Sequence, residues 1–212
     1  MSSAVPGRRR ILVEYLRQCG VQDERVLAAI AAVPRETFVP PALRHQAYDD
    51  YPLEIGEGQT ISQPSVVARV TELAQVGPRD RVLEIGAGSG YQAAVLAMLS
   101  RFVFAVERLP RLAEGARARL AELGIRNVSV QVMDGTLGWR AQAPFDAIVV
   151  SAAAPAIPPA LVEQLTEGGR LVIPIGDLRR QELVRVVRRG GDREESQHGP
   201  ATFVPLVGRE GF

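Results

Sequence analysis

The 212-residue sequence predicts an α/β fold, a doubly wound, mostly parallel sheet with helices on both faces. From residue 79 onward, short apolar runs alternate with helical segments, which is the pattern of parallel strands buried on both faces. A glycine-rich turn, Gly86–Gly90, joins the first of these runs to a helix, where doubly wound folds bind ligands. An N-terminal helical cap and C-terminal antiparallel strands complete the predicted architecture.

Residues 1–60 predict a helical cap and a linker rather than a separate domain. Apolar residues recur at helical spacing from Ile11, and Gly20 can end that helix. A second helix is expected after Asp23, a candidate N-cap. The proline-rich segment 33–43 is expected to be an ordered linker without regular structure.

Five predicted strands form the sheet and two more close it. The runs 182–190 and 201–210 are expected to form an antiparallel pair, with the charged segment 191–200 as the loop between them. The central strands are expected at 81–86, 102–107, 128–134, 145–153 and 169–176, and the helices between them at 90–99, 109–123 and 156–167.

Composition disfavours several kinds of chemistry. A net charge of +1 gives no electrostatic footprint for nucleic acid or an acidic membrane surface. All 25 basic residues are arginine, which removes Schiff-base lysine chemistry and the P-loop lysine. One cysteine, Cys19, and two distant histidines, His45 and His198, predict neither a disulfide nor a zinc site. Because the sequence lacks a signal-peptide core and an apolar run of about 20 residues, it predicts a soluble, cytoplasmic protein.

The glycine turn is suited to the close approach of a ligand. Gly86, Gly88 and Gly90 lie directly between a strand and a helix, and Glu84 precedes them on the strand. Their spacing is G-x-G-x-G, not the G-x-G-x-x-G of dinucleotide enzymes, yet the turn alone leaves a nicotinamide dinucleotide and S-adenosylmethionine both open. Ser89 is not expected to be a nucleophile, since G-x-S-x-G is not matched.

Acidic residues end the next two strands. Glu107 can accept hydrogen bonds from both ribose hydroxyls of an adenosine. Asp134 can meet the adenine amino group and Gly135 permits close approach, although an Asp-Gly turn is also common after strands. Taken in order, the three strand ends face different parts of one adenosine ligand.

Motifs between about Val33 and Val207 add a family resemblance. In VPRETFVP, GQTISQP, VLEIGAGSGYQAAVLA and FVPLVG, the sequence resembles the protein-L-isoaspartate O-methyltransferases. GQTISQP and FVPL are specific to that family, whereas the glycine turn is shared by S-adenosylmethionine methyltransferases in general. The chain departs from the residues usual in the family at Ser65, Ala87, Met133 and Ser151.

The resemblance implies methyl transfer from S-adenosyl-L-methionine to the α-carboxylate of L-isoaspartyl residues in damaged proteins and peptides, with S-adenosyl-L-homocysteine as product. That carboxylate, with a pKa near ~3.5, is ionised at neutral pH and needs no general base. Catalysis would then be alignment of the reacting atoms and exclusion of water. L-isoaspartyl proteins and peptides are the expected partners of a monomer that binds neither nucleic acid nor membrane.

The resemblance also implies a role for each site residue. Ser62 is the expected catalytic residue, a neutral donor that orients the carboxylate at less cost to reactivity than an arginine. Val204, Pro205 and Leu206 are expected to hold the substrate through main-chain hydrogen bonds, whereas the residues alone favour an ordinary edge strand. The expected cofactor-binding residues are Gln59, Thr60 and Ile61 at the methionine end, Glu84, Gly86, Gly88, Ser89 and Gly90 around the glycine turn, Glu107 at the ribose, Asp134 and Gly135 at the adenine, and Gln181 close by.

A single domain, 1–212, is expected, with 61–176 as the cofactor-binding core and 177–212 as C-terminal strands and substrate rim. The alternatives are a methyltransferase for a small molecule or RNA, an NAD-dependent dehydrogenase, and a non-catalytic adenosine-binding scaffold. The sequence has no N-P-P-Y-like motif for methylation of amino groups and no basic patch for RNA, which disfavours those methyltransferases. The spacing of the glycine turn disfavours the dehydrogenase.

The segment before the third helix admits two geometries. Pro64 at the first helical position would make Gln63 the N-cap and leave Ser62 just outside the helix. Alternatively, Ser62 itself caps, with its oxygen accepting a backbone hydrogen bond. In both cases the helix N-terminus is suited to a carboxylate.

Overall fold

A seven-stranded sheet organises the protein, with the order β5-β4-β3-β6-β7-β8-β9. The computed structural model describes residues 4–212, so the first three residues of the predicted cap lie outside it. The strands from β5 to β7 are parallel and β8 and β9 are antiparallel, which confirms the predicted fold class. The strands are β3 (Arg81–Ile85), β4 (Phe102–Glu107), β5 (Val128–Val132), β6 (Phe145–Val150), β7 (Leu165–Gly176), β8 (Gln181–Arg189) and β9 (Asp192–Ala201).

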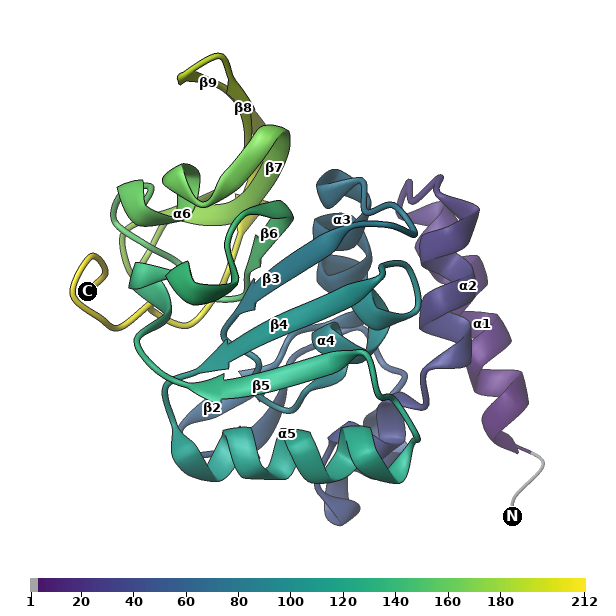
Figure 1. Cartoon of the computed structure of the whole chain (residues 1–212). Helices are drawn as coiled ribbons and strands as arrows, with labels where there is room; N and C mark the ends of the chain where they lie inside the picture. Colours follow the sequence, from purple (N-terminus) through teal and green to yellow (C-terminus); the bar gives the residue numbers. More distant parts are fainter. Residues whose placement is uncertain (1–3) are drawn as a thin grey trace.

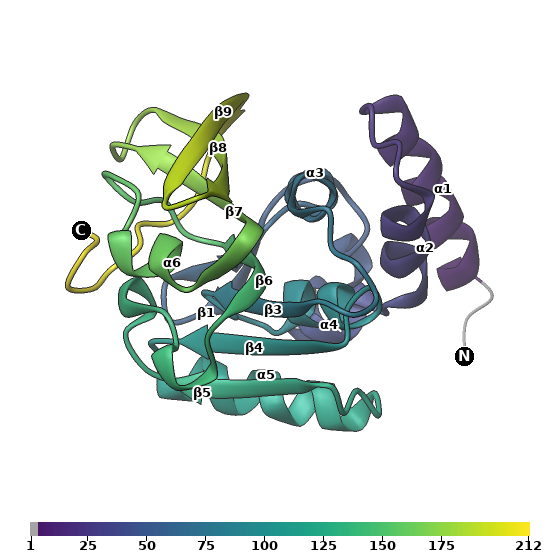
Figure 2. The same ribbon diagram turned by 45° about the horizontal axis from the view of Figure 1, so that its top comes forward.

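The helices cover the two faces of the sheet unequally. On one face pack α3 (Pro64–Ala74), α4 (Tyr91–Ala97) and α5 (Pro110–Glu122). The other face is covered by the short α6 (Pro159–Glu163) and the loops near it. The cap helices α1 (Ala4–Gln18) and α2 (Glu24–Ala32) pack on α3 and α4 and stand away from the sheet (Figures 1 and 2).

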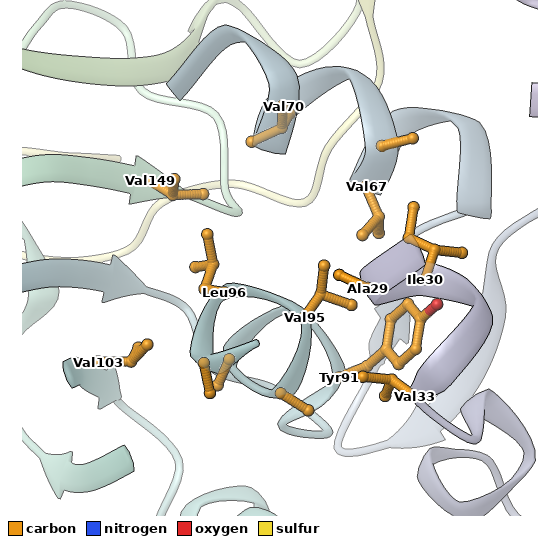
Figure 3. Close-up of a cluster of buried hydrophobic side chains, with 14 of the residues drawn as sticks. Ala29, Ile30, Val33, Val67, Val70, Tyr91, Val95, Leu96, Val103 and Val149 are labelled. Atoms are coloured by element: carbon orange, nitrogen blue, oxygen red, sulfur yellow. The ribbon is translucent and has the colours of Figure 1, made fainter. Parts of the chain in front are cut away.

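The larger buried cluster joins the cap to the sheet. Figure 3 shows Ile30 and Val33 from the α2 region beside Tyr91 of α4, with Val67 of α3 above them. Apolar burial of this kind stabilises each helix far more than its own propensity does. The cap is therefore part of the packing that holds α3 and α4 in place.

Proline content explains why the predicted linker is only partly regular. Two 3-10 helices, η1 (Arg35–Phe38) and η2 (Pro41–Gln46), lie within or across the segment 33–43, which was expected to have no regular structure. Proline fixes φ and removes an N–H, so it interrupts longer helices but tolerates short turns.

A hairpin that was not predicted lies before α3. Strands β1 (Leu53–Gly56) and β2 (Gln59–Ile61) pair antiparallel. Their turn contains Glu57 and Gly58, both at positive φ. The hairpin reaches the glycine turn, since a Cβ built on Gly88 would lie 3.3 Å from Cδ1 of Ile55.

The predicted closing pair was wrong in its second strand. β8 pairs with β9, which contains most of the charged segment that was predicted to be a loop. Gly190 and Gly191, at φ 55° and 95°, make the two-residue turn that brings Asp192 opposite Arg189. Of the predicted strand 201–210, only Ala201 belongs to β9, and Pro205 makes a single parallel bridge with Ala153.

Other differences concern element boundaries. The predicted helix 156–167 is reduced to α6, because β7 already begins at Leu165. The third and fourth predicted strands end early, at Val132 and Val150. None of the helices described in residues 4–212 combines the length and the apolar character that crossing a membrane requires.

Candidate active site

A cavity lies at the carboxyl ends of the parallel strands, where the strand order reverses between β3 and β6. Its volume is about 930 Å³, including the open mouth. The walls come from several parts of the chain: the segment 59–62 and α3, the end of β3 with the glycine turn and the start of α4, the ends of β4 and β6, Gly135, and the segment 203–207. Segments far apart in the sequence therefore meet at one place.

The glycine turn has the backbone geometry that its residues predict. Gly86, Gly88 and Gly90 have φ values of 86°, 51° and 91°, in the region where a side chain would be strained. The N–H groups of Gly86 and Ala87 donate to the Val106 carbonyl at 2.8 and 3.0 Å, which ties the turn to β4. Gly86, Gly88 and Ser89 line the cavity, whereas Gly90 faces Ala116 of α5.

Glu107 braces this turn from the end of β4. Its Oε2 accepts from the Gly88 N–H at 2.8 Å, and its Oε1 accepts from the Leu109 N–H at 2.9 Å. Each carboxylate oxygen keeps a second lone pair for a ligand donor. Glu107 lines the cavity at the position predicted for ribose binding.

Glu84 is completely buried, and neither carboxyl oxygen has a hydrogen-bond partner. Burial, together with the nearby charge of Glu107, raises the pKa of Glu84 to about 8. Because the side chain lines the cavity, a cationic or hydrogen-bond-donating ligand would satisfy it.

Of the two ligand-binding residues predicted after β5, Asp134 and Gly135, only Gly135 lies in the cavity. Gly135 lines it, and a Cβ built there would lie 2.4 Å from Cγ2 of Ile85, so only glycine fits. The Asp134 carboxylate instead accepts from Thr136 and from the Arg209 N–H, both at about 2.9 Å. Asp134 therefore fastens the C-terminal segment and does not line the cavity.

The segment that follows the β1–β2 hairpin is held on both sides of Ser62. Gln63 is the N-cap and Pro64 the first helical residue, which confirms the first of the two predicted geometries. Ser62 lines the cavity, and its carbonyl accepts from Nη2 of the buried Arg35 at 2.7 Å. Gln59, Thr60 and Ile61 line the cavity beside it.

Asp50 fixes the start of α3 from a remote loop. Its Oδ1 accepts from the Ser65 N–H at 2.8 Å, and its Oδ2 accepts from the Ser65 hydroxyl at 2.8 Å. Gln63 Nε2 also donates to this carboxylate, at 3.2 Å. Asp50 thus does for this helix what a local N-cap side chain usually does.

Gln181 lies outside the cavity and braces its wall. Nε2 donates to the Phe203 carbonyl at 3.0 Å, and Oε1 accepts from the Phe203 N–H at 2.6 Å. On the next residues, Ala153 N–H donates to the Val204 carbonyl at 2.8 Å, and Leu206 N–H donates to the Ala153 carbonyl at 2.7 Å. The segment containing Val204, Pro205 and Leu206 is thereby held extended along the cavity.

Several cavity residues were missed by sequence reasoning. Ser151 and Ala152 follow β6, and the rule that ligands bind at reversed strand ends could have identified them. Val66, Val67 and Val70 of α3 also line the cavity, although their apolar spacing signals only a packed helix face.

The titratable groups of the cavity match no acid–base pair. The lining includes the carboxyls of Glu84 and Glu107, the phenol of Tyr91 and the guanidinium of Arg108, with no histidine or cysteine. No cluster of three potential metal-ligating side chains occurs in residues 4–212. The arrangement is suited to holding and aligning ligands.

Comparison with known proteins gives a consistent result. The family model described as protein-L-isoaspartate(D-aspartate) O-methyltransferase matches residues 8–211. A protein-L-isoaspartate O-methyltransferase of Methanoculleus marisnigri is 53% identical over 205 residues, 96% of this chain and 93% of that protein. A solved protein-L-isoaspartate O-methyltransferase superposes with a TM-score of 0.86 at 31% identity, over 96% of this chain and 67% of the other.

A second solved structure adds a bound ligand. It is a Plasmodium falciparum protein described as a β-aspartate methyltransferase of this kind, in complex with S-adenosyl-L-homocysteine. The TM-score is 0.81 at 26% identity, over 94% of this chain and 98% of the other.

Proposed function

The chain belongs to the protein-L-isoaspartate(D-aspartate) O-methyltransferase family, and from this premise we propose how its residues perform the reaction. It transfers methyl from S-adenosyl-L-methionine to the α-carboxylate of L-isoaspartyl residues in damaged proteins and peptides, which initiates their repair. The dehydrogenase and scaffold alternatives are thereby set aside. The observation that supports our assignment of roles is that GQTIS and the FVPL segment border one cavity built around the glycine turn.

The residues around the glycine turn fit the cofactor. When bound, S-adenosyl-L-methionine supplies a methyl group on a positively charged sulfur. The unpartnered Glu84 carboxyl is suited to a cationic ligand, and Glu107 has free lone pairs for ribose hydroxyls. Gly88 and Gly135 line the cavity without side chains, while Gln59, Thr60 and Ile61 line the remaining side.

Ser62 is the residue to which we assign orientation of the acceptor carboxylate. Its hydroxyl is a neutral donor beside the cavity, and it makes no hydrogen bond within the described residues. A neutral donor orients the carboxylate without stabilising its ground state as strongly as an ion pair would. The carboxylate is already ionised, so this chain needs no general base.

The FVPL segment is proposed to hold the substrate main chain. Inward bonds to Ala153 and Gln181 fix it, whereas the Pro205 carbonyl and the Val207 N–H have no hydrogen-bond partner among the described residues. Free main-chain groups on an extended segment can pair with a peptide of any sequence. Such pairing suits an enzyme whose substrates share only the damaged residue.

We further propose one domain, in which 1–60 form a cap and linker, 61–176 the cofactor-binding core, and 177–212 the C-terminal strands and substrate rim. The enzyme is proposed to act as a cytoplasmic monomer without nucleic-acid or membrane partners. The free, exposed Cys19 accords with a reducing compartment.

The activity is tested with labelled S-adenosyl-L-methionine and paired peptides that differ only in containing L-isoaspartate or aspartate. Base-labile methyl incorporation is expected only in the isoaspartyl peptide, because only that peptide presents an α-carboxylate where its main chain passes through the side chain. Equal labelling of both peptides, or of neither, would contradict the function.

A further inference from the structure

Arg35 is completely buried beside Ser62, and the mechanism above does not use it. An arginine stays protonated in a protein. Burial lowers the pKa of this guanidinium, which shows that its positive charge is costly to hold there. A charge kept in such a place needs a physical reason.

The contacts of Arg35 leave its charge without a neutralising partner. Nε donates to the Ala47 carbonyl at 2.8 Å, and Nη2 donates to the Ser62 carbonyl at 2.7 Å. Cζ lies 4.8 Å from the centroid of the Tyr91 ring, and Nη1 has no hydrogen-bond partner. In the described part of the chain no salt bridge reaches Arg35. The adjacent Tyr91 phenol favours its charged form most, and Asp50 acts on it only by longer-range attraction.

The Ser62 carbonyl connects this charge to the site. It belongs to the peptide group whose N–H is that of Gln63, and a trans peptide places N–H opposite C=O. A hydrogen bond from a charged donor polarises the whole peptide group and strengthens its N–H as a donor. The Gln63 N–H makes no hydrogen bond among the described residues.

We propose that Arg35 is a positioning residue that acts through the Ser62–Gln63 peptide. It fixes Ser62 at the cavity wall and places a positive charge behind the Ser62 hydroxyl, to which we assign the isoaspartyl carboxylate. At a distance of one peptide group the charge attracts the anion but leaves its oxygen free to attack. The inference rests on the proposed role of Ser62.

Two substitutions test it. Arg35→Met removes the charge and both hydrogen bonds, and Arg35→Lys keeps the charge on a shorter reach. The control is Arg170→Met, because Arg170 donates to the carbonyls of Ala74 and Gln75 at the opposite end of α3, although unlike Arg35 it also forms a salt bridge, with Asp80. Each variant is measured at low temperature in saturating S-adenosyl-L-homocysteine, which stabilises the folded protein by mass action.

The decisive measurement is calorimetric affinity for an isoaspartyl peptide in the S-adenosyl-L-homocysteine complex. Arg35→Met is expected to weaken peptide binding roughly 10- to 100-fold, Arg35→Lys less, and both to leave S-adenosyl-L-homocysteine affinity within about twofold. Arg170→Met should lower thermal stability without changing peptide affinity. Unchanged peptide affinity in folded Arg35 variants would overturn the proposal. Failure of both variants to fold would also overturn it, because Arg35 would then serve only the stability of the core.

A double-mutant cycle with Ser62→Ala separates this inference from its premise. If Arg35 acts through Ser62, the effect of Arg35→Met on peptide affinity shrinks in the Ser62→Ala background. Additive effects contradict the inference alone. If Ser62→Ala by itself changes neither peptide affinity nor turnover, the proposed role of Ser62 fails, and the inference fails with it.

Discussion

At the residue scale, Glu84 combines complete burial with two unpartnered oxygens in the cavity to which we assign the cationic cofactor. Its pKa of about 8 means that the folded, cofactor-free protein keeps this proton at neutral pH. The unfolded chain releases the same proton near the ordinary value of 4.5. The folded and unfolded states therefore bind different numbers of protons between these two pH values.

The sign of the resulting pH dependence follows directly. Glu84 contributes stability that is fully present below pH 4.5 and is lost as the pH rises to about 8. The loss is about 1.4 kcal/mol per pH unit within that window. Glu84→Gln removes the titration, so the variant should gain stability relative to the parent from pH 5 to pH 8. Urea unfolding of the cofactor-free proteins across this range measures it, and a difference independent of pH would refute the assigned pKa.

Ser62→Ala tests the proposed catalytic residue. Loss of one orienting hydrogen bond is expected to lower kcat roughly 10- to 100-fold, while S-adenosyl-L-homocysteine affinity stays within about twofold. Ser65→Ala is the control, because that hydroxyl bonds Asp50 and does not line the cavity. Steady-state kinetics and calorimetry distinguish the two, and equal loss of turnover in both variants would argue against a special role for Ser62.

At the element scale, the FVPL segment depends on one side chain for its placement. Gln181 pairs with both main-chain groups of Phe203, so Gln181→Leu removes two hydrogen bonds. At about 1 kcal/mol each, this should raise KM for the isoaspartyl peptide roughly 30-fold and leave cofactor affinity unchanged. Peptide kinetics at saturating cofactor measure the change.

Gln164 provides the matched control for this prediction. Its side chain likewise bridges main-chain groups, accepting from the Trp139 N–H and donating to the Leu137 carbonyl, but it does not line the cavity. Gln164→Leu should cost stability without raising the peptide KM. If both variants raise KM alike, Gln181 has no particular link to the substrate.

The hairpin β8–β9 shows where reasoning about an element went wrong. Its second strand is charged and exposed, so its sequence lacks the alternation of apolar and polar residues that would predict a strand. Such a composition is typical of edge strands, in which charges prevent pairing with another chain. The local signal was the Gly190-Gly191 pair, which favours a two-residue hairpin turn.

At the scale of the whole molecule, the cavity joins a segment from the first third of the chain to its C-terminal segment. Residues 59–62 and 203–207 border the same space as the glycine turn, so a ligand there stabilises cap, core and rim together. S-adenosyl-L-homocysteine at 100 times its Kd should raise stability by about 2.7 kcal/mol. For a chain of this size that corresponds to a Tm increase of roughly 5–10 °C.

A single transition is the expected form of this unfolding. Near- and far-ultraviolet circular dichroism should report the same midpoint, and both should shift together with the ligand. Two transitions, of which only one responds to S-adenosyl-L-homocysteine, would contradict the proposal of one domain over 1–212.

The sequence by itself determined the parts of this protein that depend on local chemistry. Apolar runs specified the parallel strands, glycines at positive φ specified the turn, and Pro64 specified where α3 begins. Motif resemblance specified the family. Each of these signals is contained in a few neighbouring residues, so no knowledge of distant contacts was needed.

Only the tertiary structure decided which segment of the chain each of several polar side chains holds in place. Gln181 and Asp134, both expected at the cofactor, instead hold segments more than 20 residues away. Asp50 and Arg35 secure the residues on either side of Ser62, although neither carries a sequence signal for this. The physical reason is that a carboxylate, an amide or a guanidinium can serve many partners, and the fold alone selects the one within hydrogen-bond distance.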